Sequence, residues 1–333
     1  MSPGGFAEGG SPVEDFSGSS RAALAMVTLR TSQPKGSHMQ RILAATDFST
    51  RSQRSVRRAG LLARQTGAEL TILHAVEDDQ PTRLVELERK EAGKILDEQL
   101  NSVAELRGIN CRFVVTAGDA FNVILRTAES TSADLVVMGS HRKKLLRYIF
   151  VGTTIERVVR ASLRPVLMVN TEAAHTYTRV LAAVDKSDAS ARALQAARAL
   201  HFLDKAHVTI AHAFEPLAKS AQFIAGVPRE RIADYVAQEQ LRASAELAAF
   251  LQSHGLSDAA WSFRVEEDEP FQTISRVAAE IYPGLLVIGT HSRSGIAKIL
   301  LGSVAEEVLR ALEIDILVVP TAAERVCPSC QDI

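Results

Sequence analysis

The chain has few cysteines and few aromatic residues, and each shortage excludes a class of protein. Three of the 333 residues are cysteines, too few for the disulfide framework that holds small secreted domains together. Aromatic residues make up 5% of the chain and hydrophobic residues 46%, so the core must be aliphatic. Such a composition suits buried parallel strands covered by alanine-rich helices.

Strong net charge and long apolar runs are also absent. The formal net charge is -1, so no global field attracts nucleic acid or an anionic membrane. No apolar run of the sequence approaches the roughly 18 residues of a membrane span. The N-terminus lacks the charged-then-apolar pattern of a secretory signal. We therefore expect a cytoplasmic protein with reduced thiols, and neither a nucleic-acid nor a membrane partner.

What the sequence does contain is a long internal repeat. The segment RILAATD at 41–47 recurs as RVLAAVD at 179–185, and DLVVMGSH at 134–141 recurs as GLLVIGTH at 284–291. A spacing of about 140 to 150 residues is too long for a solenoid unit and has the size of a domain. We predict two tandem domains, the first repeat at 39–172 and the second repeat at 177–321. Residues 1–38, rich in Gly, Ser and Pro, are expected to be a disordered leader, and 322–333 a flexible tail.

Each repeat alternates strand and helix patterns. Strands are predicted at 42–46, 69–75, 111–116, 134–138, 165–169, 179–184, 207–213, 261–265, 285–288 and 316–319. Helices are predicted at 50–66, 82–106, 119–130, 153–162, 187–202, 229–254, 271–281 and 303–312. Strict alternation implies an α/β fold of two tandem doubly wound, Rossmann-like, five-stranded parallel-sheet domains. The second repeat carries extra residues at 216–228, which fit either a lid or a longer connector.

Ligands in such sheets bind at the carboxyl ends of the strands where the winding reverses. These ends carry Asp47 or Asp185 after the first strand, and Gly139 or Gly289 after the fourth. The following helix is opened by Gly152 and Thr153, or by Gly302 and Ser303. A helix N-terminus presents unpaired N–H groups and favours phosphate. The pattern therefore indicates one candidate anion site in each repeat.

These residues resemble the universal stress protein family, whose nucleotide-binding members carry Gly-x2-Gly-x9-Gly-(Ser/Thr) after the fourth strand. Both repeats keep the spacing, but Ser292 and Arg142 replace the middle glycine. The resemblance implies ATP, with magnesium as a candidate companion, held by Asp185, Gly289, Ser292, Gly302 and Ser303, and by Asp47, Gly139, Arg142, Gly152 and Thr153. In family members the aspartate contacts the adenine end, and the glycine-rich loop holds the phosphates. Ser292 is small and Arg142 bulky, so the second repeat is the favoured site.

The resemblance implies a stress-response protein that binds adenine nucleotide in at least the second repeat and acts as a sensor or protective regulator. An interaction scaffold with degenerate sites and a slow ATPase remain alternatives. The sequence shows no Ser-His-Asp pattern, Walker lysine or metal-binding helix motif, so no catalytic residue is predicted. Binding is favoured over turnover.

Three further features are interpreted more simply. His74 and His212, and also His141 and His291, occupy equivalent positions, which duplication explains better than metal binding does. Cys327 and Cys330 form a C-x-x-C pair in the tail, which fits a redox dithiol or half a zinc site but more often has no function. The last strand of each repeat is short and apolar. In family dimers such strands pair, so we expect an intramolecular pseudo-dimer, with a homodimer of whole chains left open.

Overall fold

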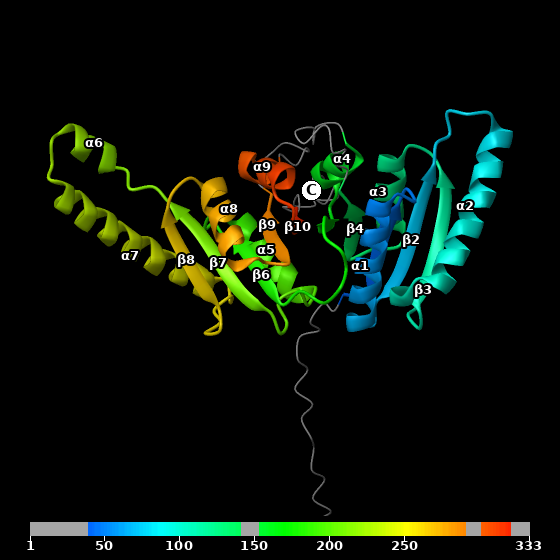
Figure 1. Cartoon of the computed structure of the whole chain (residues 1–333), viewed down its shortest axis with the longest axis horizontal. Coiled ribbons are helices and arrows are strands. Elements are labelled where there is room, and N and C mark those ends of the chain that lie inside the picture. The colour runs from blue at the N-terminus through cyan, green and yellow to red at the C-terminus, as the bar shows by residue number, and fades with distance from the viewer. Residues whose placement is uncertain (1–38, 141–152, 291–300, 321–333) are drawn as a thin grey trace, which may run out of the picture. The chain divides into compact units, whose positions relative to one another are not determined.

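The computed structural model describes residues 39–140, 153–290 and 301–320 (Figure 1). The predicted leader and tail lie outside these residues, and so do several of the residues discussed above: Arg142, Gly152, Ser292, His141, His291, Cys327 and Cys330. Within the described part of the chain, no helix is both long and apolar enough to cross a bilayer.

The first repeat alternates strands and helices as expected. Its elements are β1 (Arg41–Thr46), α1 (Thr50–Thr66), β2 (Glu69–Val76), α2 (Thr82–Ser102), β3 (Cys111–Ala117), α3 (Ala120–Ser130), β4 (Leu135–Gly139), α4 (Thr154–Ala161) and β5 (Val166–Val169). Local sequence sets the ends of α1: the Ser49 side chain accepts the N–H of Ser52, and Gly67 adopts φ 73° and donates to the carbonyl of Ala63. These are the usual N-cap and left-handed C-cap.

The second repeat follows the same order with one added helix. Its elements are β6 (Arg179–Ala183), α5 (Asp188–Ala199), β7 (His207–Phe214), α6 (Lys219–Ile224), α7 (Arg229–Ser253), β8 (Ser262–Glu267), α8 (Pro270–Ile281), β9 (Leu285–Gly289), α9 (Ser303–Ala311) and β10 (Asp315–Val319). The short helix α6 lies in the extra segment 216–228, where the sequence pattern showed no helix.

Two predicted boundaries differ from the structure by more than two residues. The helix predicted at 82–106 ends at Ser102, where Val103 turns extended (φ -75°, ψ 117°), and a single 3-10 turn, η1 (Ala104–Leu106), follows. The helix predicted at 187–202 ends at Ala199, and His201 then adopts a positive φ of 63°. Both helices were predicted too long because the apolar residues Leu106 and Phe202 continue the helical spacing. These two side chains reach the core from residues that follow the helix.

All ten strands of the described residues form one sheet, ordered β3-β2-β1-β4-β5-β10-β9-β6-β7-β8. Neighbouring strands within each repeat are parallel, and β5 pairs with β10 in the antiparallel sense. Val166, Leu167 and Met168 face Val318, Leu317 and Ile316 across this junction. The predicted pairing of the two last strands within the chain is therefore present, and the order reads the same from either edge.

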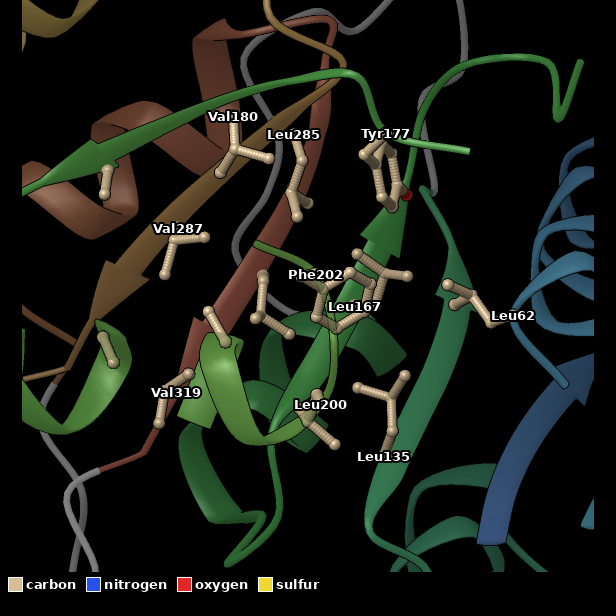
Figure 2. Close-up of a cluster of buried hydrophobic side chains, with 14 of the residues drawn as sticks. Leu62, Leu135, Leu167, Tyr177, Val180, Leu200, Phe202, Leu285, Val287 and Val319 are labelled. Carbon is tan, nitrogen blue, oxygen red and sulfur yellow. The ribbon is translucent and has the colours of Figure 1, made fainter. Parts of the chain in front are cut away.

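Helices cover both faces of the sheet, and each face has its own apolar cluster. One cluster draws on α1, α2, α5 and α7, and the other draws on α3, α4, α8 and α9. Figure 2 shows part of the first cluster, with side chains from both repeats that include Leu135, Leu167, Leu285 and Val319. Aliphatic residues dominate both clusters, as the low aromatic content predicts.

A buried ionic cluster joins α1, the segment 170–178 between β5 and β6, and β10. Asp315 is fully buried, and its Oδ2 lies 3.2 Å from Nε of Arg58 in α1. Its two oxygens also accept from the Tyr177 hydroxyl at 2.6 Å and from the Thr171 N–H and hydroxyl, each at 2.9 Å. The Arg58 guanidinium lies over the Tyr177 ring, 4.3 Å from its centroid. The corresponding positions on the other side of the junction, Ala196 and Pro165, are uncharged, so this cluster occurs once.

Burial and charge together keep Tyr177 protonated. Desolvation is the main cause that raises the pKa of its hydroxyl well above the ordinary value, and the neighbouring Asp315 carboxylate raises it further. The hydroxyl therefore remains a donor to Asp315 at any physiological pH. This hydrogen bond fixes the segment between β5 and β6 to β10.

Candidate functional site: a cavity at the carboxyl ends of the strands

The second repeat contains a cavity of about 530 Å³ at the carboxyl ends of β6 and β9. Four of its predicted site residues line this one cavity: Asp185, Gly289, Gly302 and Ser303. The fifth, Ser292, lies outside the described residues. The end of the first strand and the start of the fourth helix are therefore brought together, as the winding of the sheet requires.

Asp185 is held in place by the turn that follows β6. One carboxylate oxygen accepts the Ser187 N–H at 3.0 Å and the Ser187 hydroxyl at 2.5 Å. The Ser187 side chain in turn accepts the N–H of Ser190 and caps α5. Asp185 thus orients the residue that caps the helix, and its exposed carboxylate forms part of the cavity wall.

Gly289 serves packing between the strand and a helix. A Cβ built on it would lie 2.5 Å from the carbonyl oxygen of Ala189, in the first turn of α5. The equivalent atom on Gly139 would lie 2.7 Å from the carbonyl oxygen of Arg51. Both glycines line their cavities, but close contact between backbones is enough to explain them. The glycine at the end of the fourth strand is thus a weaker sign of a ligand than its place in the motif suggests.

Gly289→Ala is expected to lower the free energy of unfolding by about 1 to 3 kcal/mol, because the added methyl group meets backbone atoms. The control is Gly93→Ala in α2, where a Cβ meets nothing within 4 Å. This second change should raise the stability by about 0.5 to 1 kcal/mol, since alanine favours a helix interior. Denaturant melts of the two variants compare the effects directly. Equal stability of both variants would contradict the packing argument.

The N-terminus of α9 faces the cavity and lacks a side-chain cap. Gly302 occupies the cap position with extended backbone (φ -62°, ψ 155°) and, within the described residues, no side chain accepts from the first turn. Gly302 and Ser303 both line the cavity. Uncapped N–H groups and the helix dipole favour an anion at this place. The Ser303 hydroxyl adds a further donor.

The equivalent helix start in the first repeat is capped by its own side chain. The Thr153 hydroxyl accepts the N–H of Glu156 at 3.3 Å. Thr153 is not among the described residues that line the first cavity, although its neighbours Thr154 and Ile155 are. The first repeat therefore offers fewer backbone donors at this point than the second.

The cavity of the first repeat is also smaller, about 170 Å³. Asp47 and Gly139 line it, but larger side chains occupy its walls. Leu73, Ile155 and Arg51 line it where the second repeat has Ala211, Ala305 and Ala189. The difference in volume agrees with the preference for the second repeat. That preference was based on the loop residues Ser292 and Arg142, whereas the volumes differ because of side chains in the cavity walls.

Asp47 keeps the same turn as Asp185. Its Oδ1 accepts the Ser49 N–H at 3.0 Å. Partial burial acts to raise the pKa of the Asp47 carboxyl, but hydrogen bonds from Ser49 and Ser52 outweigh it and hold the pKa below its ordinary value. The Asp47 carboxylate is therefore ionised at neutral pH. Because the turn exists in both repeats, each aspartate has a structural role whether or not a ligand is bound.

The paired strand-end histidines link neighbouring strands. Nδ1 of His74 lies 2.9 Å from the carbonyl oxygen of Thr46, and Nδ1 of His212 lies 2.7 Å from that of Val184. Burial is the main cause that lowers the pKa of His212, so this ring is neutral at pH 7. Within the described residues, no group of three His, Cys, Asp or Glu side chains is arranged to hold a metal ion.

Cys111 is the first residue of β3, as the strand predicted at 111–116 implies, and it is half-buried. Burial raises the pKa of its thiol to about 11, so the sulfur is protonated at neutral pH and is a poor nucleophile.

Sequence reasoning missed the residues that set the cavity size and one polar residue in its wall. Ala211, Ala305 and Thr273 line the larger cavity. The first repeat has Leu73, Ile155 and Val123 at these positions. Aligning the two repeats along their strands and helices, as well as along their motifs, would have shown that one copy carries smaller and more polar residues.

Comparison with known proteins agrees with the architecture. A model of the universal stress protein family matches residues 38–170 and again 176–320. The universal stress protein MJ0577 of Methanocaldococcus jannaschii is 23% identical over 152 residues, which cover 39% of this chain and 94% of that protein. A solved universal stress protein from Archaeoglobus fulgidus covers 84% of this chain and 98% of its own, with 22% identity and a TM-score of 0.62.

A further solved relative is described as a universal stress protein in complex with cAMP. It is 25% identical and covers 41% of this chain and 100% of its own, with a TM-score of 0.35. The two family matches fall on the two halves of the sheet and together span most of the sequence. The chain belongs to the universal stress protein family, as a member with two tandem domains.

Proposed function

We propose that the second repeat binds one adenine nucleotide, ATP, and that the protein acts as a nucleotide-dependent sensor or protective regulator in the stress response. The observation that carries this proposal is the cavity of about 530 Å³, which lies between Asp185 and the uncapped start of α9. Its volume is in the range of small-molecule sites, roughly 300 to 1,000 Å³. The cavity of the first repeat, at about 170 Å³, falls below that range.

The lining of the cavity suits a flat base with a charged tail. Apolar side chains from β7, β9 and α9, such as Ala211, Ile288 and Ala305, form much of its wall. Gly302 and Ser303 supply the anion-favouring helix start, where the phosphates would bind. Asp185 lies at the end of β6, where the family resemblance assigns the adenine.

Magnesium fits this arrangement only as a companion of the nucleotide. Protein sites for Mg²⁺ often use one or two carboxylates together with substrate phosphates. The described residues contain no cluster of three metal-ligating side chains, so a magnesium ion would depend on phosphate oxygens and water for most of its contacts. When bound, the ion would neutralise phosphate charge.

The test is titration of ATP into the full chain, with Asp185→Asn and Asp47→Asn as a matched pair. Both aspartates accept a serine N–H at 3.0 Å in the same turn, so each substitution disturbs its turn to a similar extent. We expect one ATP per chain, an affinity about tenfold weaker in Asp185→Asn, as for one lost hydrogen bond to a charged group, and little change in Asp47→Asn.

Native mass spectrometry of the purified chain gives an independent measurement of retained nucleotide. A chain that retains no nucleotide and binds neither ATP nor cAMP at millimolar concentration would contradict the proposal and favour the interaction scaffold. Stronger binding in the first repeat, seen as a larger effect of Asp47→Asn, would contradict the choice of site.

A further inference from the structure

Thr273 carries a buried hydroxyl that the fold does not use. It lies in α8, and its side chain is 1% exposed. Its Oγ1 has no hydrogen-bond partner among the described residues. Buried polar groups are nearly always paired, so such a group calls for a specific explanation.

The first repeat shows that the fold accepts an apolar residue at this position. Val123 of α3 is the equivalent of Thr273, and it is equally buried, at 1% exposure. Valine and threonine have nearly the same shape, and the main difference between them is the hydroxyl. Because α3 packs on β2 and β1, and α8 packs on the equivalent strands β7 and β6, packing alone does not require the hydroxyl of Thr273.

The position of Thr273 supplies the explanation. Thr273 lines the larger cavity together with Ile274 and with Ala211 of β7, whereas Val123 does not line the smaller one. The side chain thus borders a largely apolar part of the cavity, where an ordered water would find few of the two to four partners it needs. A polar atom of a bound ligand would satisfy the hydroxyl.

We propose that Thr273 is a specificity-determining residue of the second repeat, whose hydroxyl hydrogen-bonds a nitrogen or oxygen atom of the nucleoside part of the ligand. This inference rests on the proposed function and deepens it. The phosphates are assigned to the start of α9, so the group that meets α8 belongs to the base or to the ribose. Both present hydrogen-bonding atoms, and an apolar ligand presents none.

The test compares Thr273→Val, which installs the residue of the first repeat, with wild type in the full chain. Without nucleotide, Thr273→Val should raise the midpoint of thermal unfolding, because an unpaired buried hydroxyl is removed. With ATP, the same variant should bind about five- to tenfold more weakly, the range for one neutral hydrogen bond. A variant that is more stable but binds ATP more weakly would show that the hydroxyl serves the ligand and not the fold.

Ser275→Ala is the matched control. Ser275 lies two residues further along α8, and its buried Oγ also has no partner among the described residues. Ser275 is not one of the residues that line the cavity, so its replacement should leave the affinity for ATP unchanged.

Two analogues distinguish the sources of the polar atom. If Thr273 contacts the ribose, wild type should prefer ATP over 2′-deoxy-ATP or 3′-deoxy-ATP, and Thr273→Val should lose that preference. If Thr273 contacts the base, wild type should prefer ATP over inosine triphosphate, and Thr273→Val should lose this preference. Equal ATP affinity of wild type and Thr273→Val would overturn the inference while leaving the proposed function intact. Absence of nucleotide binding by wild type would instead overturn the proposed function.

Discussion

Asp315→Asn is expected to lower the free energy of unfolding by about 3 to 5 kcal/mol, because it leaves the Arg58 guanidinium buried without its counter-charge. Both side chains are almost completely inaccessible, with exposures of 5% for Arg58 and 0% for Asp315. Asparagine also accepts less strongly from Tyr177 and Thr171, which both donate to this carboxylate. Denaturant unfolding of the full chain, followed by circular dichroism, measures the change.

Glu172→Gln provides the control for this prediction. Glu172 pairs with Arg54, also in α1, at 2.6 Å, but the two side chains are 63% and 34% exposed. An exposed pair contributes about 0 to 1 kcal/mol, so this variant should remain close to wild type. A double variant, Arg58→Met with Asp315→Asn, should lose less stability than the sum of the two single changes, since neither charge is left alone. Similar losses for Asp315→Asn and Glu172→Gln would show that burial does not strengthen the Asp315 contact.

Filling the larger cavity is the second change with a large expected effect. The double variant Ala211→Leu with Ala305→Ile installs the side chains that line the small cavity of the first repeat. If the site holds ATP, each added side chain must displace ligand or strain the wall at about 1 to 3 kcal/mol. The affinity should therefore fall on the order of 100-fold, which corresponds to roughly 2.7 kcal/mol. Isothermal titration of the full chain measures it.

The control for this prediction is the thermal stability of the double variant without nucleotide. The first repeat accommodates Leu73 and Ile155, at 1% and 2% exposure, so the second repeat should accept the same pair with its unfolding midpoint largely kept. Unchanged ATP binding in a folded double variant would place the nucleotide outside this cavity. Melting of the variant at a much lower temperature would show that the empty volume is needed for packing.

The sequence predicted the fold closely because two independent signals agreed. Apolar runs such as 135–138 mark strands buried on both faces, and capping residues such as Ser49 and Gly67 mark helix ends. The internal repeat then supplied each element twice. The six-residue helix α6 was missed because it has too few turns for a helical pattern, and its Phe223 and Ile224 are exposed, at 66% and 85%. The first residue of α6, Lys219, forms an ion pair with Glu267 of β8. A local sequence pattern does not show such a contact, because the two residues are distant in the sequence.

The site was predicted less fully, for a physical reason. The motif identified Asp185, Gly302 and Ser303, and all three line the cavity. It did not identify Ala211 or Thr273, because the size of a cavity depends on side chains from several elements that no local pattern connects. Gly289 was interpreted as a ligand contact, whereas a Cβ on it would meet the backbone of α5.

The antiparallel junction between β5 and β10 has a consequence for how the two repeats are associated. Each of these strands already has a neighbour on both sides, β4 and β10 for β5, and β5 and β9 for β10. No further copy of the chain can add to either of them. Because both halves belong to one chain, they are present in a fixed one-to-one ratio, and their association does not weaken on dilution. Any communication between the large cavity and its smaller counterpart should thus be independent of how much of the protein a cell contains.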